Sequence, residues 1–227
     1  MSTLFVVATP IGNLEDISAR ALRILNEVDL ILAEDTRVSR NLLTHFGIKT
    51  PMISYHQHSK LNKINEIIAK LKQGCSLALI SDAGTPSISD PGNFLVEKVI
   101  ESLGSLVKIE PIPGASAVTA IASVCGFAMD RFLFLGFPPQ KRKRRQFFEE
   151  LAKSKYPVVF YESPYRIIKS LKEMGEFDKK SSPFEIVVGR ELTKKFETIY
   201  RGNLSEVTEA IKNTPIKGEF VVAVKPQ

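Results

Sequence analysis

The stretch LALISDAGTPSISDPG, residues 77–92, joins a short apolar run to a loop that is rich in glycine, proline and hydroxyl groups. The apolar residues 77–80 have the length of a buried strand, and Asp90 followed by Pro91 is typical of a helix N-cap and first turn. Apolar residues then recur at helical spacing up to Gly104. The stretch therefore predicts a strand, a long loop and a helix, which is the repeating unit of parallel sheets.

The same unit recurs through the first half of the chain. Apolar runs at 4–8, 29–34, 51–55 and 107–109 predict further strands, and helical patterns open at Asp16, Ser39 and Ser59. Parallel strands need crossover helices that cover both faces of the sheet, and ligands bind beyond the carboxyl ends of such strands. Three unusual loops are expected at that edge, at residues 9–13, 81–92 and 111–116.

The pattern changes in the second half of the chain. Strands are predicted at 132–137, 158–162, 185–192, 197–202 and 219–224, with helices at 143–154, 164–174 and 205–212. The third and fourth of these strands are separated by only four residues, too few for a crossover, so they should pair antiparallel. We therefore expect a two-domain α/β protein. Residues 1–114 form a mainly parallel α/β domain, and residues 115–227 form an α+β domain with a mixed sheet.

Composition describes an ordinary soluble globular protein. The chain has 227 residues, of which 44% are hydrophobic and 25% charged, and its formal net charge is +6, which favours a polyanionic partner. The longest mostly apolar stretch, 117–129, is too short to span a membrane, and the N-terminus does not resemble a signal peptide. We expect a cytoplasmic protein with no membrane partner.

Metal ligation is not expected. Cys75 and Cys125 are fifty residues apart, without metal-ligand spacing, and both are interpreted as buried apolar residues. His56 and His58 have the spacing of a ligand pair, but the sequence shows no third ligand.

The loops favour an uncharged-donor site over a phosphate site. The first turn reads TPIGNLED (9–16), which lacks the glycine spacing of nucleotide-phosphate motifs. Backbone donors, carbonyls and small side chains suit a ligand with an apolar base, a polar sugar and a zwitterionic tail. A carboxylate such as Asp82 would offset the charge of a sulfonium. The basic run KRKRR (141–145) alone is typical of a solvated helix face, and it would suit a phosphate clamp if the substrate were RNA.

Eight ordered motifs give the chain a family resemblance from Phe5 to about Val224. They lie at residues 6–22, 31–43, 80–92, 111–120, 134–139, 161–167, 189–197 and 217–221. In this order they resemble the tetrapyrrole-methylase-like superfamily, and within it the ribosomal RNA small subunit methyltransferase I family. Longer members continue past the strand at 219–224, and RNA contacts of that extension are not transferred to this chain.

The resemblance implies a homodimeric, S-adenosylmethionine-dependent RNA methyltransferase that binds its cofactor in a cleft between the two domains. The implied target is the ribose 2′-hydroxyl of a cytidine in the decoding region of 16S rRNA, within the small ribosomal subunit. Matched by motif, the cofactor-binding residues are Pro10, Gly12, Asp82, Gly84, Thr85, Ser87, Ile88, Pro113, Gly114, Ser116, Ala117, Phe137, Glu162, Gly218 and Glu219.

Methyl transfer to a hydroxyl needs in-line alignment and a group that accepts or orients the proton. Glu191, Lys194 and Asp35 are candidates, and no spacing decides among them. The predicted RNA contacts are Arg37, Lys141, Arg142, Lys143, Arg144, Arg145 and Arg166, with Tyr55, Phe137 or Tyr165 available to stack on bases. Two alternatives stay open: a methyltransferase acting on a tetrapyrrole, and an RNA-binding assembly factor with a vestigial cofactor site.

Overall fold

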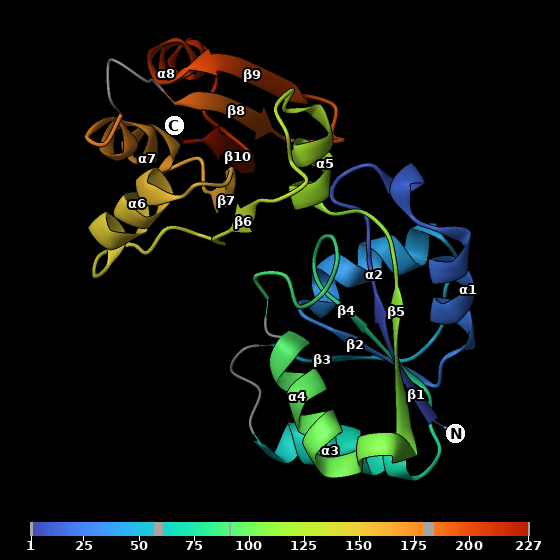
Figure 1. The fold of residues 1–227 in the computed structure, drawn as a ribbon. Coiled ribbons are helices and arrows are strands. Elements are labelled where there is room, and N and C mark those ends of the chain that lie inside the picture. The colour runs from blue at the N-terminus through green and yellow to red at the C-terminus, as the bar shows by residue number, and fades with distance from the viewer. Residues whose placement is uncertain (1, 57–60, 91, 179–183, 227) are drawn as a thin grey trace. The chain divides into compact units, whose positions relative to one another are not determined.

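The computed structural model describes residues 2–56, 61–90, 92–178 and 184–226, and His58, Ser59 and Pro91 of the sequence predictions lie outside these ranges (Figure 1). The chain divides into two compact units, residues 1–116 and 117–227, and each is described separately. No helix in the described ranges is both long enough and apolar enough to cross a membrane.

The first unit is built on a five-stranded parallel sheet, as predicted. Its strands are β1 (Ser2–Val7), β2 (Leu30–Ala33), β3 (Met52–Ser54), β4 (Leu77–Ile80) and β5 (Val107–Ile112), in the order β3-β2-β4-β1-β5. The helices are α1 (Ala19–Glu27), α2 (Thr36–His45), α3 (Leu61–Lys72) and α4 (Gly92–Leu103), with 3-10 turns η1 (Leu14–Asp16) and η2 (Gly104–Leu106). In this order β1 and β4 are neighbours, which brings the loops that follow them together.

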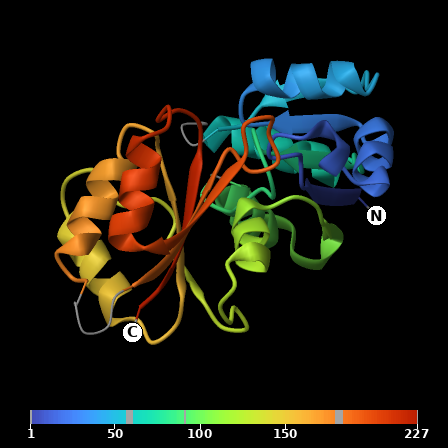
Figure 2. The same ribbon diagram turned by 90° about the horizontal axis from the view of Figure 1, so that it is seen from above.

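Alternation along the strands divides the core of this unit into two layers. Leu77 and Leu79 pack with α3 and α4, whereas Ala78 and Ile80 pack with α1 and α2. Figures 1 and 2 show helices on both faces of this sheet. Short, continuously apolar strands are expected where both faces are buried.

Two helix starts differ from the sequence prediction. Ser18, and not Asp16, caps α1, because its side chain accepts from the Ala21 backbone N–H. Helix α2 begins three residues earlier than Ser39, because Asp35 accepts from the Arg37 N–H and caps it there. Short polar side chains compete for such cap positions, so sequence alone leaves the choice open.

The second unit has a mixed five-stranded sheet in the order β6-β7-β10-β8-β9. Its strands are β6 (Leu133–Phe134), β7 (Val158–Glu162), β8 (Glu185–Arg190), β9 (Thr198–Asn203) and β10 (Phe220–Lys225). The predicted antiparallel pairing of β8 and β9 is confirmed. Strand β6 is shorter than the predicted 132–137, because Gly136 takes a positive φ of 65° and prolines follow.

Helices cover this sheet unevenly. Helices α6 (Arg144–Lys153), α7 (Ile167–Gly175) and α8 (Leu204–Lys212) pack together on one face, over Phe160, Val188 and Val222. On the other face is α5 (Ala117–Val124): a Cβ built on Gly189 would lie 3.1 Å from the Ile121 Cδ1. Figure 2 shows α6, α7 and α8 gathered on a single side of the strands.

Candidate functional site

The loops that follow β1 and β4 are joined by a backbone bridge at the carboxyl edge of the parallel sheet. The Thr9 N–H donates to the Gly84 carbonyl at 2.9 Å, and the Gly84 N–H donates to the Thr9 carbonyl at 3.1 Å. The Thr9 hydroxyl also lies 3.3 Å from the Ser81 carbonyl. The bridge therefore fixes two of the three predicted ligand loops relative to each other.

Glycine is required where the third loop, residues 113–116, meets the other two. Gly84 has a φ of +81°, and a Cβ there would lie 3.1 Å from the Ile11 Cγ2. A Cβ on Gly114 would lie 2.9 Å from that of Ala8. The Thr85 hydroxyl donates to the Ala115 carbonyl at 3.1 Å. We call the three packed loops, residues 8–13, 81–90 and 113–116, the rim.

The turn at residues 87–90 carries unusual backbone and an unpaired hydroxyl. Ser87 and Ser89 have φ values of 75° and 67°, which non-glycine residues rarely adopt. The Asp90 carboxylate holds the turn by accepting from the Ser87 and Gly92 N–H groups at 2.8 Å. The Ser87 hydroxyl oxygen is buried, and among the described residues it has no hydrogen-bond partner. Such unsatisfied polar atoms are rare and often mark ligand sites.

Three carboxylates lie where β2 and β4 end on the rim side. The Asp35 N–H donates to the Asp82 carboxylate at 2.9 Å, and the Asp82 N–H lies 3.4 Å from a Glu34 carboxylate oxygen. Partial burial, with added repulsion from neighbouring carboxylates, raises the pKa of Glu34 and of Asp82. Keeping both side chains ionised is therefore unfavourable until a positive charge approaches.

Asp35 has a different electrostatic environment, because Arg37 lies beside it. The Arg37 Nη2 is 2.6 Å from the Asp35 carboxylate, and this hydrogen bond lowers the pKa of Asp35 to about 2. The Arg37 side chain is 89% exposed. The local charged pair that the sequence suggested is thus formed, and Arg37 still faces solvent.

A second polar cluster lies in the other unit, where the loop after β8 meets the residues before β10. The Lys194 ammonium lies 2.9 Å from both the Glu191 and the Glu219 carboxylates. Glu191 also accepts from the Glu219 N–H at 2.9 Å and has a φ of 53°. A Cβ on Gly218 would overlap the Glu191 carboxyl, so glycine is required there. We call Glu191, Lys194, Gly218 and Glu219 the second cluster.

Hydrogen bonding sets the protonation of the second cluster. Hydrogen bonds from the Glu219 N–H and from Lys194 outweigh partial burial and lower the pKa of Glu191. The same two carboxylates, again against partial burial, raise the pKa of Lys194. At neutral pH this part of the site is therefore an ammonium held between two carboxylates.

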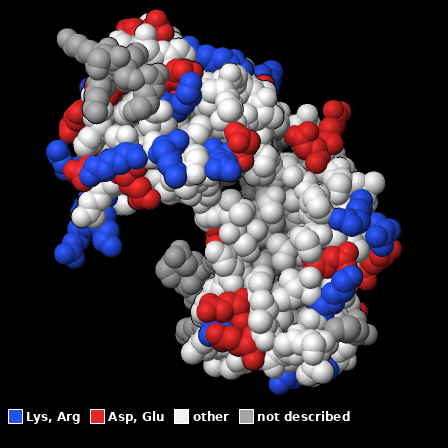
Figure 3. All heavy atoms as spheres, viewed as in Figure 1, with Lys and Arg blue, Asp and Glu red and all other residues white. Residues whose placement is uncertain are grey.

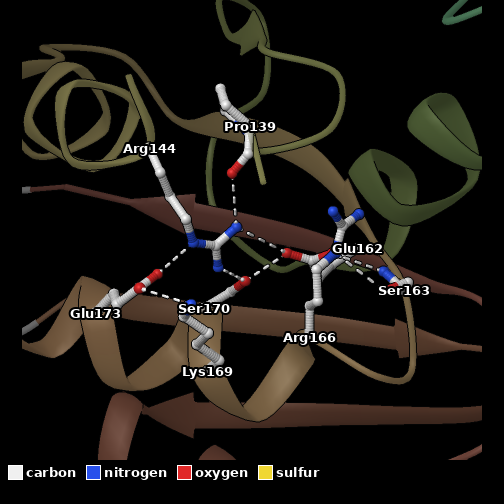
Figure 4. A network of polar contacts seen from close by, with 8 residues as sticks. All are labelled: Pro139, Arg144, Glu162, Ser163, Arg166, Lys169, Ser170 and Glu173. Carbon is white, nitrogen blue, oxygen red and sulfur yellow. Dashed lines mark hydrogen bonds and ion pairs between the residues drawn. The ribbon is translucent and has the colours of Figure 1, made fainter. Parts of the chain in front are cut away.

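Arg144 and Glu162 form the centre of a buried network in the second unit (Figure 4). The Arg144 guanidinium reaches the Glu173 carboxylate at 2.6 Å, the Ser170 hydroxyl at 2.7 Å and the Pro139 carbonyl at 3.1 Å. The Ser170 hydroxyl in turn donates a short hydrogen bond to Glu162. The other Glu162 oxygen accepts from the Ser163 N–H at 2.8 Å and from the Arg166 Nε at 3.0 Å.

This network corrects two predicted site residues. Arg144 is 6% exposed and Glu162 is 1% exposed, so neither side chain reaches an external ligand. Arg144 is a structural member of the basic run and not an RNA contact, and the Glu162 carboxylate does not contact a cofactor. The sequence contained no signal for their partners Ser170 and Glu173, because only the fold brings β7, α6 and α7 together.

The other predicted residues separate by unit. Pro10, Gly12, Asp82, Gly84, Thr85, Ser87, Ile88, Pro113, Gly114 and Ser116 belong to the rim or directly follow its strands, whereas Ala117, Phe137, Gly218 and Glu219 belong to the second unit. Phe137 is 50% exposed and its ring lies 5.3 Å from that of Tyr161. Tyr55 is 2% exposed, so the suggestion that it stacks on a base is wrong. Within the described ranges, no group of three or more metal-ligating side chains is arranged to hold an ion.

Four members of the basic run remain exposed around the loop that precedes α6. They are Lys141, Arg142, Lys143 and Arg145. Figure 3 shows basic side chains projecting from this loop into solvent. Arg145 lies within 3.6 Å of Glu176 and 3.3 Å of Glu149, so it is less available than its three neighbours.

The fold and the rim define a class, the methyltransferases of the tetrapyrrole methylase fold. Solved structures of diphthine synthase and of the cobalamin biosynthetic enzyme cobalt precorrin-4 methyltransferase share the fold. Their TM-scores are 0.72 and 0.69 at 15% and 19% identity, and the alignments cover 98% and 97% of this chain and 90% and 94% of those chains.

Sequence comparison gives the family. A model of the tetrapyrrole (corrin/porphyrin) methylases matches residues 3–208. "Ribosomal RNA small subunit methyltransferase I" of Synechocystis is 44% identical over 99% of this chain and 79% of its own length, and the Thermotoga maritima protein of that name is 41% identical over 99% and 98%. The chain belongs to the tetrapyrrole methylase family and, within it, to the ribosomal RNA small subunit methyltransferase I family. The predicted resemblance is confirmed.

Proposed function

We propose that the protein transfers a methyl group from S-adenosylmethionine to the ribose 2′-hydroxyl of a cytidine in the decoding region of 16S rRNA. The observation that carries this proposal is the match, over nearly the whole chain, to relatives named for methylation of small-subunit rRNA. We extend the proposal to a homodimer that acts in the bacterial cytoplasm on the small ribosomal subunit.

The rim fits the proposed cofactor. Gly84 and Gly114 leave backbone close to open rim positions that a side chain would fill, and the buried Ser87 hydroxyl has an unused hydrogen-bonding capacity. Asp82 and Glu34 supply negative charge for a cationic ligand. When bound, S-adenosylmethionine would supply an electrophilic methyl group on its sulfonium. In the second unit, Ala117, Phe137, Gly218 and Glu219 remain proposed cofactor contacts.

The three candidates for handling the hydroxyl proton differ in suitability. Asp35 is a weak base at neutral pH, because Arg37 lowers its pKa to about 2. Lys194 is protonated, because two carboxylates hold it. We therefore propose that Lys194 donates a hydrogen bond that orients the ribose, and that Glu191 keeps Lys194 in place. Alignment, and not strong base catalysis, is then the main contribution of these side chains.

RNA would be positioned by the exposed cations Arg37, Lys141, Arg142 and Lys143, with Arg145 in a lesser role. Phosphate contacts of this kind fix the register of an RNA strand without reading its sequence. Because they act through counterion release, their contribution decreases as salt concentration rises.

The test is a methyl-transfer assay on three substrates in parallel. Purified protein is incubated with methyl-labelled S-adenosylmethionine and unmethylated small subunits, naked 16S rRNA or a tetrapyrrole, and nucleosides are identified by mass spectrometry. Labelled 2′-O-methylcytidine is the expected product. Label in the tetrapyrrole alone would replace the proposal with the small-molecule alternative.

Asp82→Ala separates the enzyme from an assembly factor. The Asp82 side chain is exposed and accepts one backbone hydrogen bond, so the variant should fold. We expect it to lose cofactor binding and methyl transfer. If cells that carry only this variant assembled subunits normally where a deletion strain did not, an additional assembly role would be required.

A further inference from the structure

The turn between β7 and α7, residues 163–166, presents an aromatic ring to solvent. Tyr165 is 95% exposed, the highest value among the large apolar side chains found on the surface of the described residues. The Arg166 N–H and the Ile167 N–H both donate to the Ser163 carbonyl at 3.0 Å, and Pro164 occupies the second turn position. The backbone under the ring is therefore fixed.

The base of this turn is anchored to the buried network. The Glu162 carboxylate accepts from the Ser163 N–H and from the Arg166 Nε, at 2.8 and 3.0 Å, and its side chain is fully buried. A buried carboxylate with several charge-assisted partners is a rigid support. Tyr165 and Arg166 are thus displayed by an ordered turn, and little ordering entropy would oppose binding to them.

Arg166 keeps two donors for an external group. Its Nε is bonded to Glu162 and to the Ser163 hydroxyl, whereas its two Nη atoms have no hydrogen-bond partner among the described residues (Figure 4). The same network also fixes the start of the basic loop, because Arg144 binds the Pro139 carbonyl. One buried support therefore displays an aromatic ring, a guanidinium and the loop that carries Lys141, Arg142 and Lys143.

We propose that this turn binds one unpaired nucleotide of the rRNA substrate: Tyr165 stacks on its base and the Arg166 Nη atoms contact an adjacent phosphate. This inference rests on the proposed function. Single-stranded RNA is the occupant that the chemistry favours, because splayed bases stack on aromatic rings and a guanidinium binds phosphate in a bidentate manner. A protein partner would need a wider apolar surface, and here one ring stands beside cations.

Tyr165→Ala tests the stacking. Removing one base-stacking aromatic is expected to weaken RNA binding about 5-fold to about 150-fold. Tyr165→Phe retains the ring and should bind within about two-fold of wild type. Leu106→Ala is the matched surface control, because Leu106 is 72% exposed and lies in the first unit, just before the amino-terminal end of β5. Cofactor affinity should be unchanged in all three variants.

A fluorescent variant reports the contact directly. The chain contains no tryptophan, so Tyr165→Trp places a single indole on the turn. We expect its emission to be quenched by a single-stranded fragment of the target region, while Leu106→Trp is not quenched. Scanning abasic sites through the fragment should reveal one position at which Tyr165→Ala no longer weakens binding, because the stacked base is already absent.

The outcomes separate the two proposals. If wild type methylates rRNA and Tyr165→Ala binds rRNA as wild type does, the turn does not bind a nucleotide and the proposed function stands. If wild type transfers no methyl group to RNA, the proposed function fails. In that case quenching of the Tyr165→Trp variant by RNA would still support the turn as a nucleotide site, and absence of quenching would overturn it.

Discussion

Replacing Arg144 by alanine should destabilise the protein strongly, whereas the same change at Arg142, two residues earlier, should not. Both residues belong to one run of five basic side chains. Arg144 is 6% exposed and bonded to Glu173, Ser170 and the Pro139 carbonyl, while Arg142 is exposed. The pair therefore tests whether burial, and not local composition, decides what each cation does.

The expected loss can be worked out from the groups that Arg144 leaves behind. Removing one partner of a buried ion pair typically costs about 3–5 kcal/mol, because the other charge stays buried. Here Glu162 keeps Arg166 and the Ser163 N–H, and the Glu173 side chain is 29% exposed. Both features reduce the penalty, so we expect about 3 kcal/mol. For a chain of this length that corresponds to a fall in Tm of about 6 to 12 °C.

Calorimetry and urea unfolding of wild type, Arg144→Ala, Arg144→Lys and Arg142→Ala provide the measurement. Arg144→Lys keeps the charge but lacks the planar fork, so its stability should lie between wild type and alanine. Arg142→Ala should stay within about 0.5 kcal/mol of wild type, as exposed substitutions usually do. The reasoning is refuted if Arg144→Ala unfolds with wild-type midpoints, or if Arg142→Ala is destabilised equally.

Three further predictions address the rim and the basic loop. Gly84→Ala should cost about 1–2 kcal/mol for its positive φ plus a crowding cost against Ile11. Gly47→Ala, with a similar φ and open space, should show the first cost alone in thermal unfolding. Exchanging residues 141–143 for glutamate should lower RNA affinity and reduce the salt slope by about 0.7 per lost contact, with cofactor binding by calorimetry unchanged. Because the folded pKa values of Glu34 and Asp82 are raised, their ionisation should lower the unfolding free energy as pH rises from about 4 through those pKa values. Stabilisation by S-adenosylmethionine should accordingly be larger at pH 6.5 than at pH 4, as measured by Tm shifts.

Much of the fold could be predicted because its signals are local. Continuous apolar runs of four to six residues recur with helical patterns between them, and β4 and β7 have the predicted bounds of 77–80 and 158–162. The four-residue connection between β8 and β9 determined their antiparallel pairing. Helix starts were less predictable, since Asp16, Ser18, Asp35 and Ser39 are all competent caps and the fold selects among them.

The site was predictable only where a residue's role is set by its place at the end of a strand. The carboxyl-edge rule placed the loops after β1, β4 and β5 together, and the backbone bridge between Thr9 and Gly84 is its result. Roles that depend on distant partners were not predictable. Neither the burial of Arg144 nor the pairing of Lys194 with Glu219 has a signal in sequence spacing, because the partners are 29 and 25 residues away.

Departures from ordinary folding preferences concentrate at one place on the parallel unit, and this concentration supports a ligand site there. Ser87 and Ser89 take left-handed backbone, the Ser87 hydroxyl is buried and unpaired among the described residues, and Glu34 and Asp82 hold like charges close together. Each feature is unfavourable for folding alone, and natural sequences retain such features mainly where function requires them. A cationic ligand with hydrogen-bonding groups would relieve both the charge repulsion and the unpaired hydroxyl, which is the chemistry that S-adenosylmethionine would bring to the rim.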